Sequence, residues 1–303
     1  MRQEAYFCTV KELDELGKNN IPRQLISHTH LIYSSPATLA FNSPGAEGFG
    51  VKRAGLAVPD SVMLIVSPGC CGRNTSVLSS MRAYQDRFYY LLMDETDIVT
   101  GRHLKKIPKA VAEICEGLKK KPSVVMICIT CVDALLGTDM ERVCHKAEEY
   151  AGVPVRPCYM YALTREGRKP PMVHVRQSVY SLLEPKKKKG NVVNLLGYFS
   201  PLTDDCELYD LLHGAGVKTI HEISRCKDYA QYQTMSEANF NLVLHPEARF
   251  AAEDFHDRLK IPYIELRRLY QIDKIASQYR ALAAALGVEF EDEIPRKAAE
   301  VAV

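Results

Sequence analysis

Short apolar segments recur along the chain and give the first indication of its fold. Most are rich in aliphatic side chains, and such continuous apolar runs are typical of strands that are covered on both faces. They begin at about residue 61 and are separated by polar or helix-like stretches. The predicted strands are residues 61–67, 88–93, 123–130, 153–156, 192–197, 217–222, 241–245 and 263–266.

Helical patterns lie between these predicted strands. Apolar side chains recur there at spacings of three and four residues, which places them on one face of a helix. The clearest stretches are residues 104–118, 208–212 and 250–259. Alternating strands and crossover helices predict an α/β fold, with parallel sheets that carry helices on both faces.

A polar stretch at residues 184–191 interrupts this alternation. It contains Pro185, four consecutive lysines and Gly190, and a new apolar segment follows it directly. Such a stretch predicts a domain boundary, with tandem Rossmann-like domains at 1–186 and 187–303. The lysine run is interpreted as a solvated linker, with a docking patch as the alternative. Residues 288–303 are expected to form a terminal helix or a frayed tail.

Composition narrows the class of protein. With 303 residues, 47% of them hydrophobic and 25% charged, the chain is neither disordered nor fibrous. A net charge of +2 gives no general electrostatic reason to bind nucleic acid or an anionic membrane. No apolar run approaches the ~18 residues of a membrane span, and the first residues are too polar for a signal peptide. We therefore expect a cytoplasmic protein.

Ten cysteines are the unusual feature of the composition. In a reducing compartment they are expected to be free thiols or thiolate metal ligands. The apolar patterns place Cys115, Cys128 and Cys144 among core positions. Cys8, Cys206 and Cys226 stand alone and are interpreted as incidental, and the role of Cys158 stays open.

Three cysteines differ from the others because they directly follow predicted strands. Cys70 and Cys71 come after the strand at 61–67, and Cys131 comes after the strand at 123–130. Ligands of open α/β sheets bind at this carboxyl edge. Thiolates placed there are candidate iron ligands, although two such loops could also simply be neighbours.

The same segments resemble a known family. SPGCCG (67–72), ITCVDALLGTD (129–139), NLVLHP (241–246) and KIPYIEL (260–266) are similar, in this order, to segments of the nitrogenase component 1 family. That family includes nitrogenase catalytic subunits, their cofactor-assembly scaffolds, and reductases of tetrapyrroles. The resemblance extends from about residue 25 to 287 and implies the tandem Rossmann-like fold of that family.

The resemblance also implies a metal site. Cys71 matches the second and Cys131 the third cysteine that ligates the family's subunit-interface cluster, and Cys70 is adjacent and could replace or join Cys71. No cysteine stands near residues 41–44, where the first ligand would fall. Because a [4Fe-4S] cluster needs four thiolates, two chains would share it, either as a homodimer or with a paralogous chain.

The candidate catalytic residues come from the resemblance too. His245 stands where nitrogenase holds its large cofactor by a cysteine, and it could ligate iron, cap the strand or face a pocket. His174 and Arg176 match the part of the family chain that enters the active site. Two basic groups, at residues 102–106 and 165–169, could clamp substrate carboxylates or be solvated surface.

The function implied by these matches is reductive. We expect the catalytic component of a two-component reductase, which accepts electrons from an ATP-hydrolysing iron–sulfur partner that alone binds ATP. The expected small-molecule substrate is an unsaturated organic compound such as a tetrapyrrole, rather than dinitrogen. The alternative is a non-catalytic scaffold or carrier for metallocofactor assembly, and a third possibility is an interaction subunit that binds no metal.

Overall fold

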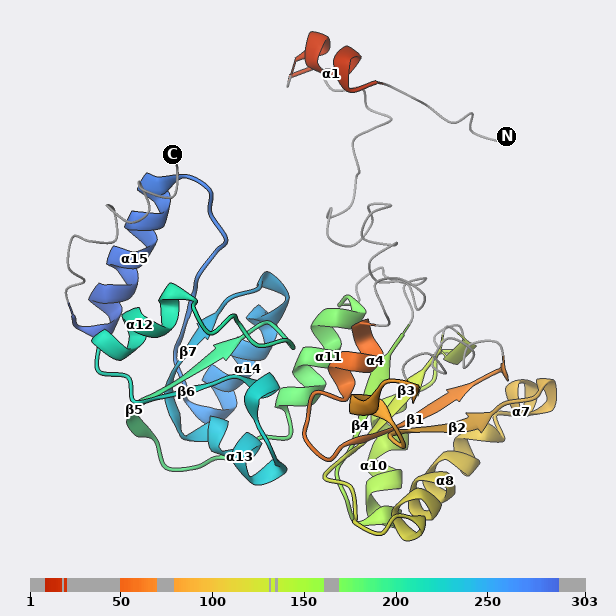
Figure 1. The fold of residues 1–303 in the computed structure, drawn as a ribbon. Coiled ribbons are helices and arrows are strands. Elements are labelled where there is room, and N and C mark those ends of the chain that lie inside the picture. The colour runs from red at the N-terminus through yellow and green to blue at the C-terminus, as the bar shows by residue number, and fades with distance from the viewer. Residues whose placement is uncertain are drawn as a thin grey trace.

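The structure is a computed structural model, and it describes residues 9–17, 19–20, 50–69, 79–130, 132–133, 136–160 and 169–288. A short helix, α1 (Val10–Leu16), lies near the N-terminus, and its first turn is closed by a capping box between Thr9 and Glu12. The remaining elements form two α/β units that follow one another along the chain (Figure 1).

The first sheet contains four parallel strands in the order β2-β1-β3-β4. Its first strand is central, so the chain adds β2 on one side and then crosses over to add β3 and β4 on the other. The carboxyl ends of β1 and β3 are therefore neighbours at the point where the winding reverses. The strands are β1 (Val62–Ser67), β2 (Phe88–Leu92), β3 (Val125–Ile129) and β4 (Val155–Tyr159).

The second sheet repeats this winding, with four parallel strands in the order β6-β5-β7-β8. Its strands are β5 (Lys189–Leu196), β6 (Thr219–His221), β7 (Ala238–Val243) and β8 (Tyr263–Glu265). All eight predicted strands are present, and the predicted tandem Rossmann-like α/β fold is confirmed. The domain limits at residue 186 stay a prediction.

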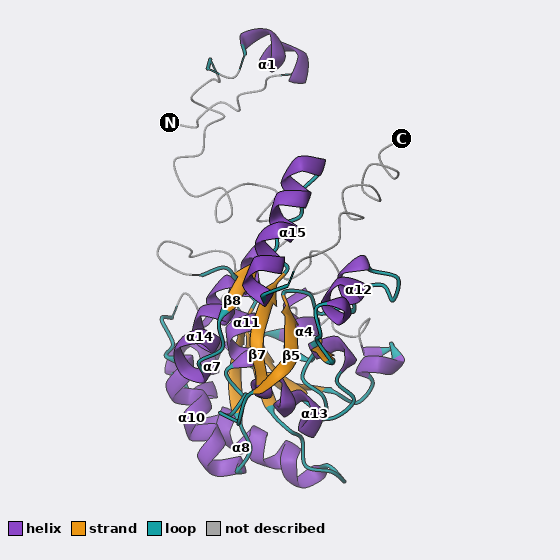
Figure 2. Ribbon diagram, turned by 90° about the vertical axis from the view of Figure 1, so that its left-hand side faces the viewer, coloured by secondary structure: helices purple, strands orange, loops and turns teal. Residues whose placement is uncertain are grey.

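Helices cover both faces of the first sheet. Figure 2 views the molecule from the side, with strands in the middle and helices on either side of them. On one face, α8 (His103–Gly117) and α10 (Met140–Ala151) bury Ile107, Val111 and Cys144 against the strands. On the other face, α4 (Gly50–Gly55) and α11 (Pro171–Tyr180) pack together. Side chains of β1 alternate between these faces, as expected for a strand. The short elements here are η2 (Arg82–Tyr84) and α7 (Glu95–Thr100).

The second sheet is also covered on both faces. α12 (Glu207–Gly214) and α15 (Ile272–Leu286) contribute Leu208, Leu212 and Leu282 to one apolar layer. α14 (Arg249–Leu259) buries Phe255 and Leu259 on the opposite face. The remaining short helices are α13 (Tyr229–Gln233), η3 (Ile223–Arg225), η4 (Thr234–Glu237) and η5 (Pro246–Ala248).

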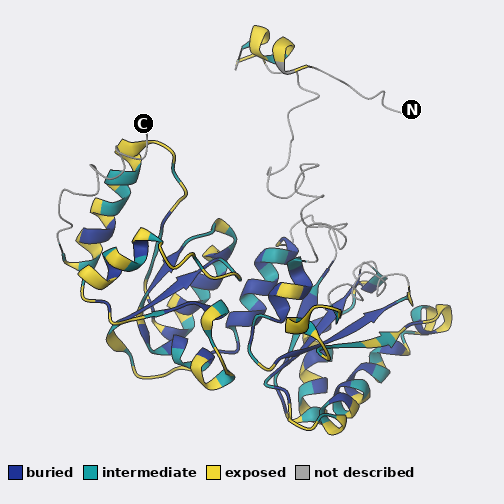
Figure 3. Cartoon of the chain, viewed as in Figure 1, coloured by how far each residue is buried: buried dark blue, intermediate teal, exposed yellow. Residues whose placement is uncertain are grey.

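The two sheets share one apolar core through α11. The buried ring of Tyr180 on α11 lies edge-on to that of Phe255 on α14, with centroids 5.3 Å apart. The Tyr232 hydroxyl of α13 donates to the Val179 carbonyl oxygen. One cluster of buried side chains includes residues of both units. Figure 3 shows buried segments, in dark blue, on both sides of this contact.

Some elements differ from the prediction. β4 was expected at 153–156 but runs through Pro157 to Tyr159, and the missing N–H of Pro157 is tolerated because β4 is an edge strand. α11 and α15 were not predicted. The lysine run is not simply solvated, since Lys188 donates to the Ser236 carbonyl and Lys189 pairs with Glu237.

Over the described part of the chain, no helix has the length and apolarity that a bilayer crossing requires.

Candidate functional site

The carboxyl edge of the first sheet is where the sequence predicts the metal ligands. Val66 of β1 pairs with Ile129 of β3, so these two strands end side by side. Cys70, Cys71 and Cys131 follow these ends but lie outside the described residues. Their assignment as iron ligands therefore stays a prediction.

Two buried hydroxyl groups occupy this edge. Ser67 ends β1 and Thr130 follows β3, and the side chains are 0% and 2% exposed. Neither hydroxyl has a hydrogen-bond partner within the described ranges. A buried donor without a partner is costly. These groups fit an anionic iron–sulfur group held nearby, because its sulfur atoms accept hydrogen bonds.

Several described cysteines have a raised pKa, which favours the thiol form. Cys128 and Cys158 face each other across β3 and β4, and hydrogen bonding to Cys128, followed by burial, raises the pKa of the Cys158 thiol. Burial likewise raises the pKa of Cys144. Cys115, Cys128 and Cys144 belong to or pack against the core, as predicted. Cys158 is core as well.

A buried network of polar side chains stabilises the carboxyl edge of the first sheet. His103, at the start of α8, places Nε2 2.9 Å from Oδ1 of Asp133, and both side chains are about 1% exposed. Its Nδ1 lies 3.0 Å from the Asp97 carbonyl oxygen, which can only accept, so Nδ1 donates. Thr138 donates to the same Asp133 oxygen. This network fixes the chain two residues after Cys131.

Two members of the basic group at 102–106 pair with a carboxylate of the chain itself. Arg102 and Lys106 each bind the buried Asp97 carboxylate at 2.8 Å. The hydrogen bonds from Lys106 and then Arg102 hold the pKa of Asp97 well below its ordinary value. Within the described structure Arg102 and Lys106 thus bind a carboxylate of the chain, and a role of this group as a clamp for substrate carboxylates stays a prediction. In the other basic group, Lys169 is described and 165–168 are not.

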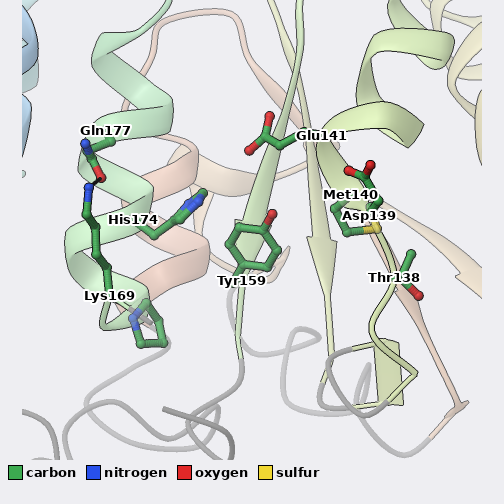
Figure 4. Close-up of a pocket in the computed structure, with 9 residues that line it drawn as sticks. Thr138, Asp139, Met140, Glu141, Tyr159, Lys169, His174 and Gln177 are labelled. Carbon is green, nitrogen blue, oxygen red and sulfur yellow. Dashed lines mark hydrogen bonds between the residues drawn. The ribbon is translucent and has the colours of Figure 1, made fainter. Parts of the chain in front are cut away.

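A pocket of about 440 Å³ opens beside His174, between α11 and the start of α10 (Figure 4). The His174 ring stands edge-on to Tyr159, with centroids 4.2 Å apart. Burial and then Lys169 lower the pKa of His174 to about 4, so the imidazole is neutral at pH 7. Figure 4 shows the acidic side chains of Asp139 and Glu141 across the pocket from α11.

Arg176 joins α11 to the second sheet. Its buried guanidinium donates twice to the Gly197 carbonyl oxygen, at 3.1 and 2.7 Å, and pairs with Glu247 at 2.8 Å. A further bond reaches the Met172 carbonyl oxygen, so the group is fully engaged within the chain. These contacts favour a bridging position for Arg176. Its prediction as a catalytic residue stays untested.

His245 follows β7 and lines a cavity of about 420 Å³ at the carboxyl edge of the second sheet. Its Nδ1 accepts from the Glu247 N–H at 3.3 Å, which caps η5, and its side chain is 36% exposed. Burial and then the Arg176 charge lower its pKa. His245 thus faces the pocket, one of its three predicted roles, and it caps the short helix η5 rather than the strand. Its role as an iron ligand stays a prediction. In the described part of the chain, no three His, Cys, Asp or Glu side chains are grouped to hold a metal ion.

An adjoining cavity of about 490 Å³ lies between the same strand ends, α12 and α15. Arg267 and Arg268 line both cavities, and sequence reasoning missed them. Their position could have indicated them, since they directly follow the predicted strand at 263–266. Both cavities lie at the reversal point of the second sheet, where ligands of open α/β sheets bind.

The sequence profile of the family described as Nitrogenase component 1 type Oxidoreductase matches residues 47–302. The chain therefore belongs to this family. The family resemblance stated from the sequence is confirmed.

Several relatives are described as nitrogenase iron-molybdenum cofactor biosynthesis protein NifE. The chain is 27% identical to the protein of Nostoc sp. over 239 residues, which cover 76% of this chain and 49% of the relative. For Klebsiella pneumoniae the identity is 27% over 266 residues, covering 80% and 58%. For Methanococcus maripaludis it is 23% over 249 residues, covering 79% and 51%. The chain spans about half the length of these curated relatives.

Solved structures of nitrogenase Cp1 have a similar fold. The structure at pH 6.5 gives a TM-score of 0.60 with 18% identity, over 80% of this chain and 58% of that chain. The structure at pH 5 gives a TM-score of 0.56 with 22% identity, over 82% and 53%. At this level of identity, the similarity establishes the fold alone.

Proposed function

We propose that the chain is a scaffold or carrier on which an iron-based cluster is assembled or transferred. The observation that carries the proposal is that its relatives from three organisms are described as cofactor biosynthesis proteins. His245 is accessible, and among the described residues it belongs to no group of three potential metal ligands, which suits a cargo that must leave again. The sequence favoured a catalytic reductase, and the comparisons support the alternative better.

A resident [4Fe-4S] group at the first sheet belongs to the proposal. Cys71 and Cys131, with Cys70 beside them, would supply two thiolates per chain, and a second copy or a paralogous chain would complete the set. Ser67 and Thr130 would donate hydrogen bonds there. When bound, such a group accepts and releases single electrons.

The second candidate is a reductase. The family description as an oxidoreductase favours it, and so does the neutral imidazole of His174 in its own pocket. In this case an ATP-hydrolysing iron–sulfur partner would supply the electrons. The substrate would be a small unsaturated organic molecule.

The first experiment is purification without oxygen, followed by iron and sulfide counting and electron paramagnetic resonance. We expect about four irons per dimer, and loss of the signal in Cys71→Ala and Cys131→Ala. Cys206→Ala is the control, because this partly exposed cysteine occupies the N-cap position of α12 in the second unit, without a side-chain capping bond. Iron that stays unchanged in both loop variants removes these cysteines from the ligand set.

An iron-transfer experiment distinguishes the scaffold function from the reductase function. A scaffold loaded with labelled iron should pass the label to a metal-free acceptor protein without consuming ATP. A reductase should instead retain its iron and oxidise its cluster only when substrate is added. Retained label together with substrate-dependent oxidation would overturn the scaffold proposal.

A further inference from the structure

We propose that the hydroxyl groups of Ser67 and Thr130 set the reduction potential of the iron–sulfur group at the carboxyl edge of the first sheet. This inference rests on the proposed function, which places a resident [4Fe-4S] group at that edge. It adds a regulatory role for two residues that are not predicted ligands. The position of the two side chains, their burial and their missing hydrogen-bond partners carry it.

The two side chains are neighbours at the end of the sheet. Val66 of β1 pairs with Ile129 of β3, so Ser67 and Thr130 come next on the two strands. Paired residues of parallel strands lie on the same face, and neighbouring strands are only about 4.8 Å apart. Both hydroxyls can therefore reach one common group. Thr130 directly precedes Cys131, the predicted ligand on this strand.

The missing partners distinguish these hydroxyls from others that are buried. In the described part of the chain, the buried Ser61, Ser178 and Ser236 each have a hydrogen-bond partner. Within the same ranges, Ser67 and Thr130 have none, although both are buried. A buried hydroxyl that donates to nothing costs free energy, and this cost disappears when an acceptor lies beside it. The pair is therefore suited to an acceptor that the fold itself does not provide.

Hydrogen bonds from these hydroxyls change how readily the group is reduced. The sulfur atoms of an iron–sulfur group accept hydrogen bonds, and such bonds tune its potential. Reduction adds one electron from a low-potential one-electron donor, and no covalent bond forms or breaks. A donor binds a more negative acceptor more strongly, so the added electron strengthens both hydrogen bonds. Ser67 and Thr130 therefore raise the reduction potential and stabilise the reduced form.

Redox titration of the full-length chain with dithionite, without oxygen and followed by electron paramagnetic resonance, tests this role. Ser67→Ala and Thr130→Val should each make reduction about tenfold less favourable, which lowers the midpoint potential by about 59 mV. Thr130→Ser keeps a hydroxyl and should keep the wild-type potential. Ser236→Ala is the matched control, because it removes a buried hydroxyl that donates to the Gln233 carbonyl oxygen in the second unit. Its potential should be unchanged.

Urea unfolding of the metal-free chain adds a measurement that needs no iron. Removal of a hydroxyl without a partner should not lower the free energy of unfolding, so Ser67→Ala and Thr130→Val should be at least as stable as the wild type. Ser236→Ala should be less stable, because it loses a hydrogen bond.

The outcomes separate this inference from the proposed function. Unchanged potentials in Ser67→Ala and Thr130→Val that still contain iron would overturn the inference and leave the scaffold proposal intact. If both variants destabilise the metal-free chain as Ser236→Ala does, the hydroxyls serve the fold, and the inference is wrong as well. A wild-type chain purified without any iron would instead refute the resident group, and this inference with it.

Discussion

The burial of His174 makes the stability of the chain depend on pH. Its pKa is about 4 in the folded chain, against an ordinary value of 6.5, so the unfolded chain binds the proton more readily. The free energy of unfolding therefore falls as the pH is lowered from 6.5 to 4, by up to about 3 kcal/mol from this residue. His174→Phe, which keeps a ring against Tyr159, should remove this part of the slope.

Urea unfolding between pH 7.5 and 4 measures the effect. Burial also lowers the pKa of His221 and His245, so the variant should retain a shallower slope of the same sign. His145→Phe is the control, because His145 is largely exposed on α10. Equal slopes in the wild type and in His174→Phe would contradict the prediction.

Individual residues were predictable from the sequence where a periodic pattern contained them. Cys128 alternates within an apolar strand and Cys144 lies on an amphipathic helix, and both are buried as expected. The role of Cys158 could not be predicted, because Pro157 made the strand seem to end before it, whereas β4 continues to Tyr159. Arg267 and Arg268 were missed because exposed arginines after a strand have the same sequence signature as solvated surface.

At the scale of elements, Gly197 allows the chain after β5 to approach His245, the residue that caps η5 after β7, closely. Its φ is +133°, and a Cβ placed on it would lie 2.7 Å from the His245 Cβ and backbone nitrogen. Gly197→Ala should lower the free energy of unfolding by about 2–3 kcal/mol, because both backbone strain and this contact must be relieved. Thermal and urea denaturation measure the change.

Gly190→Ala is the matched control for this strand. Gly190 lies on β5, and nothing comes within 4 Å of the position of an added Cβ. Its substitution should change stability by less than about 0.5 kcal/mol. A Gly197→Ala variant as stable as Gly190→Ala would show that the strand ends separate freely.

There are physical reasons why the sequence did not predict helix α11. α11 is buried on most sides, between α4, β4 and α14, so its apolar residues form no single stripe. The helix also begins at Pro171, directly after Pro170, and two consecutive prolines are typical of a loop in the sequence. The strands were found because continuous aliphatic runs predict a sheet that is covered on both faces.

At the scale of the whole molecule, the two sheets depend on contacts made far apart in the sequence. Arg176 reaches Gly197 and Glu247, and Arg258 of α14 donates to the Tyr180 and Leu183 carbonyl oxygens. No local pattern specifies these pairs, so the sequence predicted two units but not their joining. The shared core implies that the units stabilise one another.

Phe255→Ala tests this coupling. Phe255 is fully buried on α14 and contacts Tyr180, so its truncation should cost about 3–5 kcal/mol. If the sheets unfold together, amide hydrogen exchange should accelerate equally in β1 and β3 of the first sheet and in β5 and β7 of the second. Leu212→Ala, in the apolar layer that only the second unit forms, should show whether this spread requires the shared core. Acceleration confined to β5 and β7 in Phe255→Ala would mean that the two units unfold independently, and the contacts of α11 would then orient the sheets without stabilising both.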